Sequence, residues 1–310
     1  MTGLGQDTSL GVGNDASLAL EQAERPEEAH QARPPLSPLK RLLLYAALIA
    51  VAVVMLFPGY WMFVTAVTQE GKEFTFPPAF WPDPIAWENF PAALTAWPFD
   101  LFFRNSLTIA VLATVGALIT EAMAGYAFAR MRFPGRDLWF AVALATLMLP
   151  FVVTMVPRFI IFRELRMIDT IWPLIVPFWF GGSAFGIFLF RQYFRTLPYD
   201  LDEAAKLDGA GHLRILWSVI LPQSMAIIVT LAILHFVFFW NDFLGPLIYI
   251  QSTENKTVSL GLMSFKGQYE QDWNFMMAAA LTMVIPIVLI VLAGQRYFQR
   301  GISLTGIGGR

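Results

Sequence analysis

Six long apolar segments, almost free of charged residues, constrain this 310-residue chain more than any other feature. A helix needs about 20 consecutive apolar residues to cross the hydrocarbon core of a bilayer. The segments are residues 42–66, 107–129, 138–157 and somewhat beyond, 171–190, 215–240 and 275–295. Each is continuous rather than alternating in hydrophobicity and is far longer than a barrel strand, which favours helices. We therefore predict an all-α integral membrane protein with six transmembrane helices.

The composition agrees with a chain that lies mostly in lipid. Hydrophobic residues make up 56% of the sequence and charged residues only 14%, against about 25% charged residues in an ordinary soluble domain. The 21 basic and 23 acidic residues nearly balance, so no nucleic-acid partner is expected, because binding to phosphates requires a basic face. The absence of cysteine excludes disulfides, thiolate catalysis and cysteine-bound metals, and it leaves the redox compartment undetermined.

The two ends of the chain differ from the membrane domain, which we assign to residues 39–300. Residues 1–38 are polar and rich in glutamate and proline, a composition typical of a disordered tail. They do not resemble a signal peptide, because the apolar segment begins too late. We assign residues 301–310 to a short C-terminal tail.

The distribution of lysine and arginine predicts the orientation of the chain. With the N-terminus inside, 14 of the 21 basic residues fall in segments on that side of the membrane. Cytoplasmic loops carry an excess of these residues. We therefore predict that both termini lie in the cytoplasm.

A polar island, EAAKLDGAGHLRILWSVILP at residues 203–222, interrupts the apolar segments on the predicted cytoplasmic side. Asp200 and Glu203 have the spacing of an N-cap residue and its reciprocal partner, so a short helix can begin here. Asp208 and Gly209 supply the turn chemistry that ends a helix, and we expect Gly209 to adopt a backbone conformation that is costly for other residues. A second helix can begin at Ala210. The pattern predicts two short helices at an angle, although an ordinary connector between spans would also be polar.

This island resembles the EAA loop of permease subunits in ATP-binding-cassette (ABC) importers, which fits a groove on a separate ATPase subunit. Other stretches are similar to the smaller, six-span permease of maltose-type carbohydrate importers: GYAFARMRFPGR at 125–136, WNDFLGPLIYI at 240–250, LGLMSFKGQYEQDWNFMMA at 260–278 and QRYFQRGI at 295–302. The resemblance implies a bacterial or archaeal cell-membrane complex of two permeases, two ATPase subunits and an extracytoplasmic sugar-binding protein, with a carbohydrate as substrate.

The resemblance also implies which residues meet the partner proteins. Contact with the ATPase is expected at Glu203, Ala204, Ala205, Asp208, Gly209 and Leu213. Contact with the binding protein is expected at Gly261, Gly267, Gln268, Tyr269 and Asp272, although an ordinary surface connector is the alternative for this loop.

Three polar residues at or near membrane depth are candidates for the pore or for helix packing: Glu121, Asn241 and Asp242. Glu121 departs from the family pattern, in which a small or hydroxyl residue is more usual at this position. An unpaired carboxylate at mid-membrane costs about 2.5–3.5 kcal/mol. We therefore expect Glu121 to face a neighbouring element or the pore.

No motif in the chain predicts an enzyme. There is no GxxxxGK[ST] loop to hold a triphosphate, and the three histidines have no metal-ligand spacing. We expect no cofactor, and we expect ATP to be hydrolysed by a separate subunit. A secondary transporter coupled to an ion gradient or an intramembrane enzyme would be the alternatives. Co-purification with an ATPase subunit distinguishes them, because neither alternative requires one.

Overall fold

The computed structural model describes residues 37–73, 75–77, 79–266 and 272–304, with side chains up to residue 295. The described elements are helical, as the apolar segments predict. Residues 1–36 of the predicted N-terminal tail and 305–310 of the C-terminal tail lie outside this range. The first described helix begins at Pro38 and the last ends at Leu304.

Three described helices are long and apolar enough to cross a membrane. They are α2 (Pro38–Ala66), α4 (Phe99–Arg130) and α15 (Trp273–Leu304), the last over its residues Trp273–Gln295. The chain divides into two compact units, Met1–Phe57 and Pro58–Arg310. The first unit contributes the beginning of α2, and all the sites described below belong to the second.

Two further predicted spans are bent. Helix α5 (Arg136–Ala145) and the 3₁₀ turn η1 (Thr146–Met148) meet α6 (Phe151–Glu164) at 98°. The break falls at Leu149, which is extended as the residue before a proline prefers to be. A second bend, of 85°, separates residues 212–223 from α12 (Met225–Trp240). Counting each bent pair as one span gives up to five spans among the described residues, so the predicted number of six stays a prediction.

The segment 171–190 is not the single helix that its hydropathy predicts. It consists of the 3₁₀ turn η2 (Trp172–Leu174), the one-turn helix α7 (Val176–Trp179) and the first half of α8 (Ala184–Thr196). Gly182 takes a positive φ of 55°, and the Ser183 hydroxyl accepts a hydrogen bond from the amide of Phe185, which starts the new helix. Local turn chemistry therefore overrides hydropathy here.

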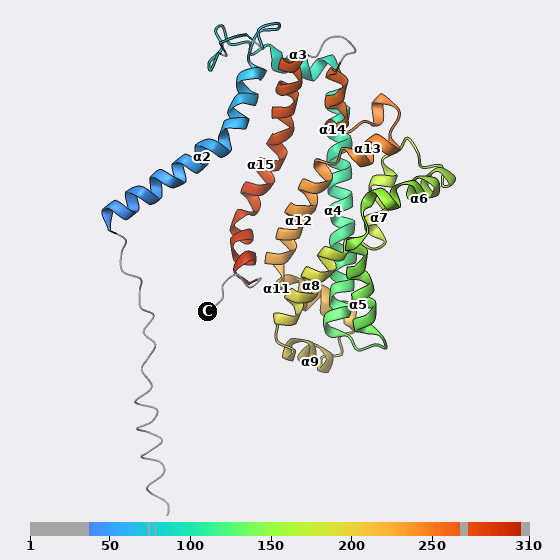
Figure 1. Cartoon of the computed structure of the whole chain (residues 1–310). Coiled ribbons are helices and arrows are strands. Elements are labelled where there is room, and N and C mark those ends of the chain that lie inside the picture. The colour runs from blue at the N-terminus through green and yellow to red at the C-terminus, as the bar shows by residue number, and fades with distance from the viewer. Residues whose placement is uncertain (1–36, 74, 78, 267–271, 305–310) are drawn as a thin grey trace, which may run out of the picture. The chain divides into compact units, whose positions relative to one another are not determined.

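Helix α4 lies at the centre of the second unit and packs against α7, α8 and α12, while α12 also packs against α15 (Figure 1). One buried cluster joins α4, α12 and α15 through aromatic rings and alanines: Phe99, Phe102, Phe236, Phe239, Trp240, Ala278 and Ala279. A second cluster lies where α4 and α8 end and includes Phe190, Phe194, Ile215, Leu216 and Ile220.

The remaining helices are short. They are α3 (Asn89–Ala96), α9 (Asp200–Leu207), α10 (His212–Ile215), the π-helix η3 (Leu216–Ile220), α11 (Leu221–Gln223), α13 (Leu244–Tyr249), η4 (Thr253–Asn255), α14 (Val258–Gly261) and η5 (Leu262–Phe265). Helices α9 to α11 (residues 200–223) contain the polar island and connect α8 to α12. They lie at the end of α4 where Arg130 is the last residue.

Candidate functional site

The polar island folds into the two short helices that its sequence predicts, α9 and α10, separated by a sharp turn. Gly209 has a φ of 80°, which confirms the expected left-handed conformation. Its amide donates to the carbonyl of Lys206, and the amide of Ala210 donates to the carbonyl of Ala205, both at 2.9 Å. This is the Schellman arrangement, in which two otherwise unbonded carbonyls at a helix end are satisfied.

The start of α9 differs from the prediction. Asp200 is the first helical residue, and Tyr199 occupies the N-cap position without a side-chain hydrogen bond to the helix. The prediction that Asp200 is the N-cap residue and Glu203 its reciprocal partner was therefore wrong. The acids of the first turn, Asp200, Asp202 and Glu203, favour this end of the helix through its dipole instead.

A buried ion pair fastens α9 to the membrane helices. Arg130, the last residue of α4, places Nη1 3.1 Å from Oδ2 of Asp202, and the two side chains are 1% and 6% exposed. Nη2 of Arg130 also donates to the carbonyls of Phe194 and Leu197 at the end of α8, at 2.5 and 2.7 Å. One guanidinium thus joins α4, α8 and α9, and removing either charge would leave the other buried without compensation.

Two tyrosines complete this anchor. The hydroxyl of Tyr126 donates to Oδ1 of Asp202 at 3.2 Å. The guanidinium carbon of Arg130 lies 4.2 Å from the ring centre of Tyr199, whose hydroxyl donates to the carbonyl of Ala129 at 3.3 Å. The contacts among these residues were not predicted from the sequence. The available signal was an arginine at the very end of an apolar segment, and it does not indicate which acid pairs with it.

The opposite face of the island is open. Glu203, Ala204, Asp208, Gly209 and Leu213 are exposed, whereas Ala205 is half-buried and packs against the second buried cluster. Leu207, which the sequence analysis did not select, is 90% exposed, and Leu213 is 62% exposed. The element is therefore fixed on one side. On the other it exposes Leu207, Leu213 and the carboxylates of Glu203 and Asp208, a combination suited to docking against another protein.

Glu121 lies fully buried in the middle of α4 and faces its neighbours. Its carboxylate accepts a hydrogen bond from the amide of Ser183 at 2.7 Å and lies 2.9 Å from Nε2 of His235 on α12. Gly182 and Gly186 make room for it, because a Cβ on either glycine would overlap the glutamate side chain. Glu121, on α4, thus links the turn between α7 and α8 to α4 and α12.

Asn241 and Asp242 lie at the far end of α12, near each other and away from Glu121. Asn241 is exposed, and its amide donates to the carbonyl of Val237 at 2.8 Å. Asp242 is half-buried, and its Oδ1 accepts from the amide of Gly245 at 3.1 Å, at the start of α13. The three polar residues selected from the sequence therefore belong to two separate places.

The predicted binding-protein loop runs from Gln251 to Trp273, and the structure describes all of it except residues 267–271. Gly261 is buried in α14 against the ring of Phe102, so it is not part of an exposed contact surface. Gly267, Gln268 and Tyr269 lie outside the described residues. Asp272 is half-buried and precedes α15, where its carbonyl accepts from the amide of Met276 at 2.9 Å.

Comparisons with known proteins agree with one another. Residues 121–304 match the family described as binding-protein-dependent transport system inner membrane component. The sn-glycerol-3-phosphate transport system permease protein of Yersinia enterocolitica is 35% identical over 269 residues, covering 84% of this chain and 95% of the relative. The protein of the same name from Salmonella choleraesuis is 36% identical over 266 residues, covering 83% and 94%.

The fold also matches a solved structure. A chain of a bacterial ABC transporter involved in the import of the acidic polysaccharide alginate superposes with a TM-score of 0.74 and 22% identity, covering 86% of this chain and 99% of that one. At this identity the match concerns the fold alone. Together with the sequence relatives and the two-helix island, it shows that the chain belongs to the binding-protein-dependent inner-membrane components, the permeases of ABC importers.

Proposed function

We propose that this chain is one of two permease subunits of an ABC importer for a carbohydrate or a carbohydrate derivative, and that residues 203–222 dock on an ATPase subunit. The observation that best supports this proposal is the asymmetry of the island. One face is anchored by the buried pair of Arg130 and Asp202, and the other exposes Glu203, Leu207 and Leu213.

This asymmetry suits the transmission of movement. When two ATPase subunits close on ATP, the grooves that hold the island shift, and a rigid element passes that shift to the membrane helices. The Arg130 guanidinium binds α8 and α9 at once, so α9 cannot move without α4 and α8. Glu203 can accept a charge-assisted hydrogen bond from a basic residue of the groove.

The proposed topology follows the lysine and arginine distribution. Both termini and the island lie in the cytoplasm, and the segment around Asp272 faces an extracytoplasmic sugar-binding protein. The partners are then a second permease, two ATPase subunits, the binding protein and the surrounding lipid. A carbohydrate derivative as substrate is supported by the sequence relatives, which are named for sn-glycerol 3-phosphate.

The test is charge reversal at Glu203 in the complete transporter. Glu203→Lys should leave the subunit at normal levels in the membrane and should abolish co-purification of the ATPase and ATP-dependent uptake. Glu254→Lys is the matched control, because Glu254 is also exposed but lies on η4, in the connection between α13 and α14. Unchanged ATPase association and uptake in Glu203→Lys would contradict the docking role. A wild-type chain that never co-purifies with an ATPase would instead favour a secondary transporter.

A further inference from the structure

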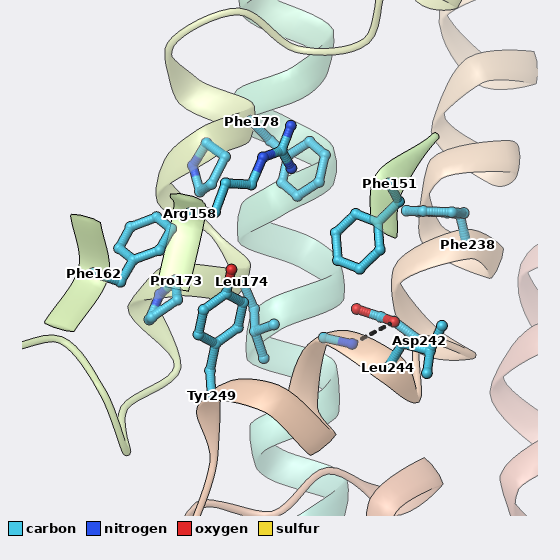
Figure 2. Close-up of a pocket in the computed structure, with 12 residues that line it drawn as sticks. Phe151, Arg158, Phe162, Pro173, Leu174, Phe178, Phe238, Asp242, Leu244 and Tyr249 are labelled. Atoms are coloured by element: carbon cyan, nitrogen blue, oxygen red, sulfur yellow. Dashed lines mark hydrogen bonds between the residues drawn. The ribbon is translucent and has the colours of Figure 1, made fainter. Parts of the chain in front are cut away.

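A cavity of about 380 Å³ lies at the end of α12 farthest from the polar island, between α6, α7, α12 and α13 (Figure 2). Its walls are mainly apolar, and five of the twelve lining residues are aromatic: Phe151, Phe162, Phe178, Phe238 and Tyr249. Arg158 and Asp242 are the charged residues that line it. A volume of this size is in the range of small-molecule sites, which combine apolar walls with a few polar groups.

The walls of the cavity are held by ring contacts. Phe162 packs edge-on against Tyr249 with ring centres 5.5 Å apart, and Phe178 packs in the same way against Phe239 at 4.4 Å. Each contact joins two elements that are distant in the sequence. The cavity is therefore formed by the packing of the fold and does not depend on one mobile side chain.

The two charged residues of the cavity are not equivalent. Asp242 already accepts a hydrogen bond from the amide of Gly245, at 3.1 Å (Figure 2). Arg158 makes no ion pair with any residue that the structure describes. The ring centre of Phe151 lies 5.9 Å from its guanidinium carbon. Asp242 is thus held by a backbone amide, whereas the Arg158 guanidinium has no carboxylate at ion-pair distance among the described residues and can pair with an anionic group.

We propose that this cavity is a substrate site on the transport path and that it selects an anionic sugar or polyol derivative. A guanidinium matches the geometry of a phosphate or a carboxylate, which it can hold with two parallel hydrogen bonds. The Arg158 guanidinium holds the anionic group, and the aromatic walls cover the apolar faces of the carbon skeleton. The proposal rests on the proposed function, because it assumes that the chain is a permease for such compounds.

The absence of cysteine offers a direct test in the assembled transporter. Leu244 lines the cavity and is 55% exposed, so Leu244→Cys gives this subunit one thiol at the site. In vesicles, the anionic methanethiosulfonate reagent should modify this thiol faster than the cationic one, and Arg158→Gln should remove that preference. Arg163→Gln is the control, since Arg163 lies on the same helix but pairs with Glu164 at 2.8 Å and does not line the cavity.

Protection of the thiol then identifies the chemical class of the ligand. We expect sn-glycerol 3-phosphate, glucuronate or both to slow labelling, which separates the phosphate from the carboxylate, and we expect glucose to have no effect. Arg158→Gln should raise the half-protecting concentration of the effective anion about tenfold, with Arg158→Lys in between. An unchanged reagent preference in Arg158→Gln, or protection by neither anion, would overturn the proposal.

Two further measurements distinguish the substrate site from a lipid site and from a failure of the proposed function. Labelling in phosphatidylcholine vesicles is compared with labelling in vesicles that contain phosphatidylglycerol. Protection by the anionic lipid alone would assign Arg158 to a lipid headgroup and reject the substrate site. Co-purification of the ATPase is measured on the same samples. A transporter that keeps its ATPase but shows no effect of Arg158 would disprove the cavity proposal and leave the proposed function intact.

Discussion

Two buried carboxylates of this permease, Asp202 in the polar island and Glu121 in the middle of α4, are balanced by different partners. Asp202 meets Arg130, which is charged at any pH that a cell encounters. Glu121 meets His235, whose imidazole is charged only when protonated, and a backbone amide. The comparison shows a permanent ion pair where the chain attaches the polar island, and a histidine–carboxylate pair where it closes a break between helices.

The largest effect is expected from breaking the permanent pair. Arg130→Met leaves Asp202 buried without its counter-charge and should lower the free energy of unfolding by roughly 3–5 kcal/mol. Thermal or denaturant unfolding in detergent measures the loss. The double variant Arg130→Met with Asp202→Leu should recover most of it, because no buried charge remains. If the single and double variants were equally unstable, packing and not charge would account for the anchor.

A smaller effect is expected at Glu121. Glu121→Leu leaves the Ser183 amide and the His235 ring without their acceptor, so unfolding should become easier by roughly 2–4 kcal/mol. Glu121→Gln is the matched variant. Its amide oxygen can still accept from the Ser183 amide, and its loss should be about 1 kcal/mol. Equal stability of the leucine and glutamine variants would show that the hydrogen bonds of Glu121 do not hold the break.

The turn at Gly209 should be destabilised by a residue with a side chain. Gly209→Val forces a φ of 80° on a branched residue, which costs roughly 1–2 kcal/mol. No atom lies within 4 Å of the position of its Cβ, so the effect is conformational and not steric. Weaker co-purification of the ATPase measures it. Gly181→Val is the control, because that site is equally open and lacks a positive φ; similar losses in both variants would refute the argument.

The smallest effect concerns Asp169, a carboxylate between α6 and η2 that forms no ion pair within the part of the chain that the structure describes. Its Oδ1 accepts from the amides of Ser252 and Gln251 at 2.8 and 2.9 Å, and these bonds, that of Ser252 first, hold its pKa below the ordinary value. It therefore stabilises the fold at pH values above the ordinary aspartate pKa, and this contribution is lost as the pH falls through the lowered pKa.

Hydrogen exchange measures this dependence directly. The amides of Ser252 and Gln251 should keep their protection at the ordinary aspartate pKa of about 3.9 and lose it as the pH falls below that value, and in Asp169→Asn their protection should no longer depend on pH there. Asparagine is a suitable replacement because it tolerates the positive φ of 60° at this position. Identical pH profiles in the two proteins would exclude Asp169 as the titrating group.

Local chemistry in the sequence was sufficient for part of this site. Asp208 and Gly209 predicted the turn, and the structure confirms the conformation of Gly209. The same reasoning predicted an N-cap at Asp200 and was wrong, because acidic residues are also favoured in the first turn of a helix, where Asp200 lies. The burial cost of Glu121 predicted a partner, and the structure supplies His235 and the amide of Ser183.

Long-range pairing was beyond the sequence. Nothing near Arg130 in the chain indicates Asp202, because the two meet only after α4, α8 and α9 have packed. Hydropathy also treated 171–190 as one span, since averaging over a window hides a turn as short as Gly181-Gly182-Ser183. The cavity around Arg158 has the same origin, because side chains from five elements, α6, η2, α7, α12 and α13, line it.

The 85° bend at Ser224 has a mechanical consequence. Ser224 is fully buried, and its hydroxyl donates to the carbonyl of Ile220 at 2.7 Å, which places a side-chain hydrogen bond at the bend. A bend that keeps its angle converts a push along one arm into a sideways swing of the other arm. Here one arm is the end of the island, and the other is α12, which carries His235 and ends two residues before Asp242 at the cavity. In the proposed importer, a small movement of an ATPase subunit at the island would therefore become a sideways movement of α12 beside the proposed substrate site.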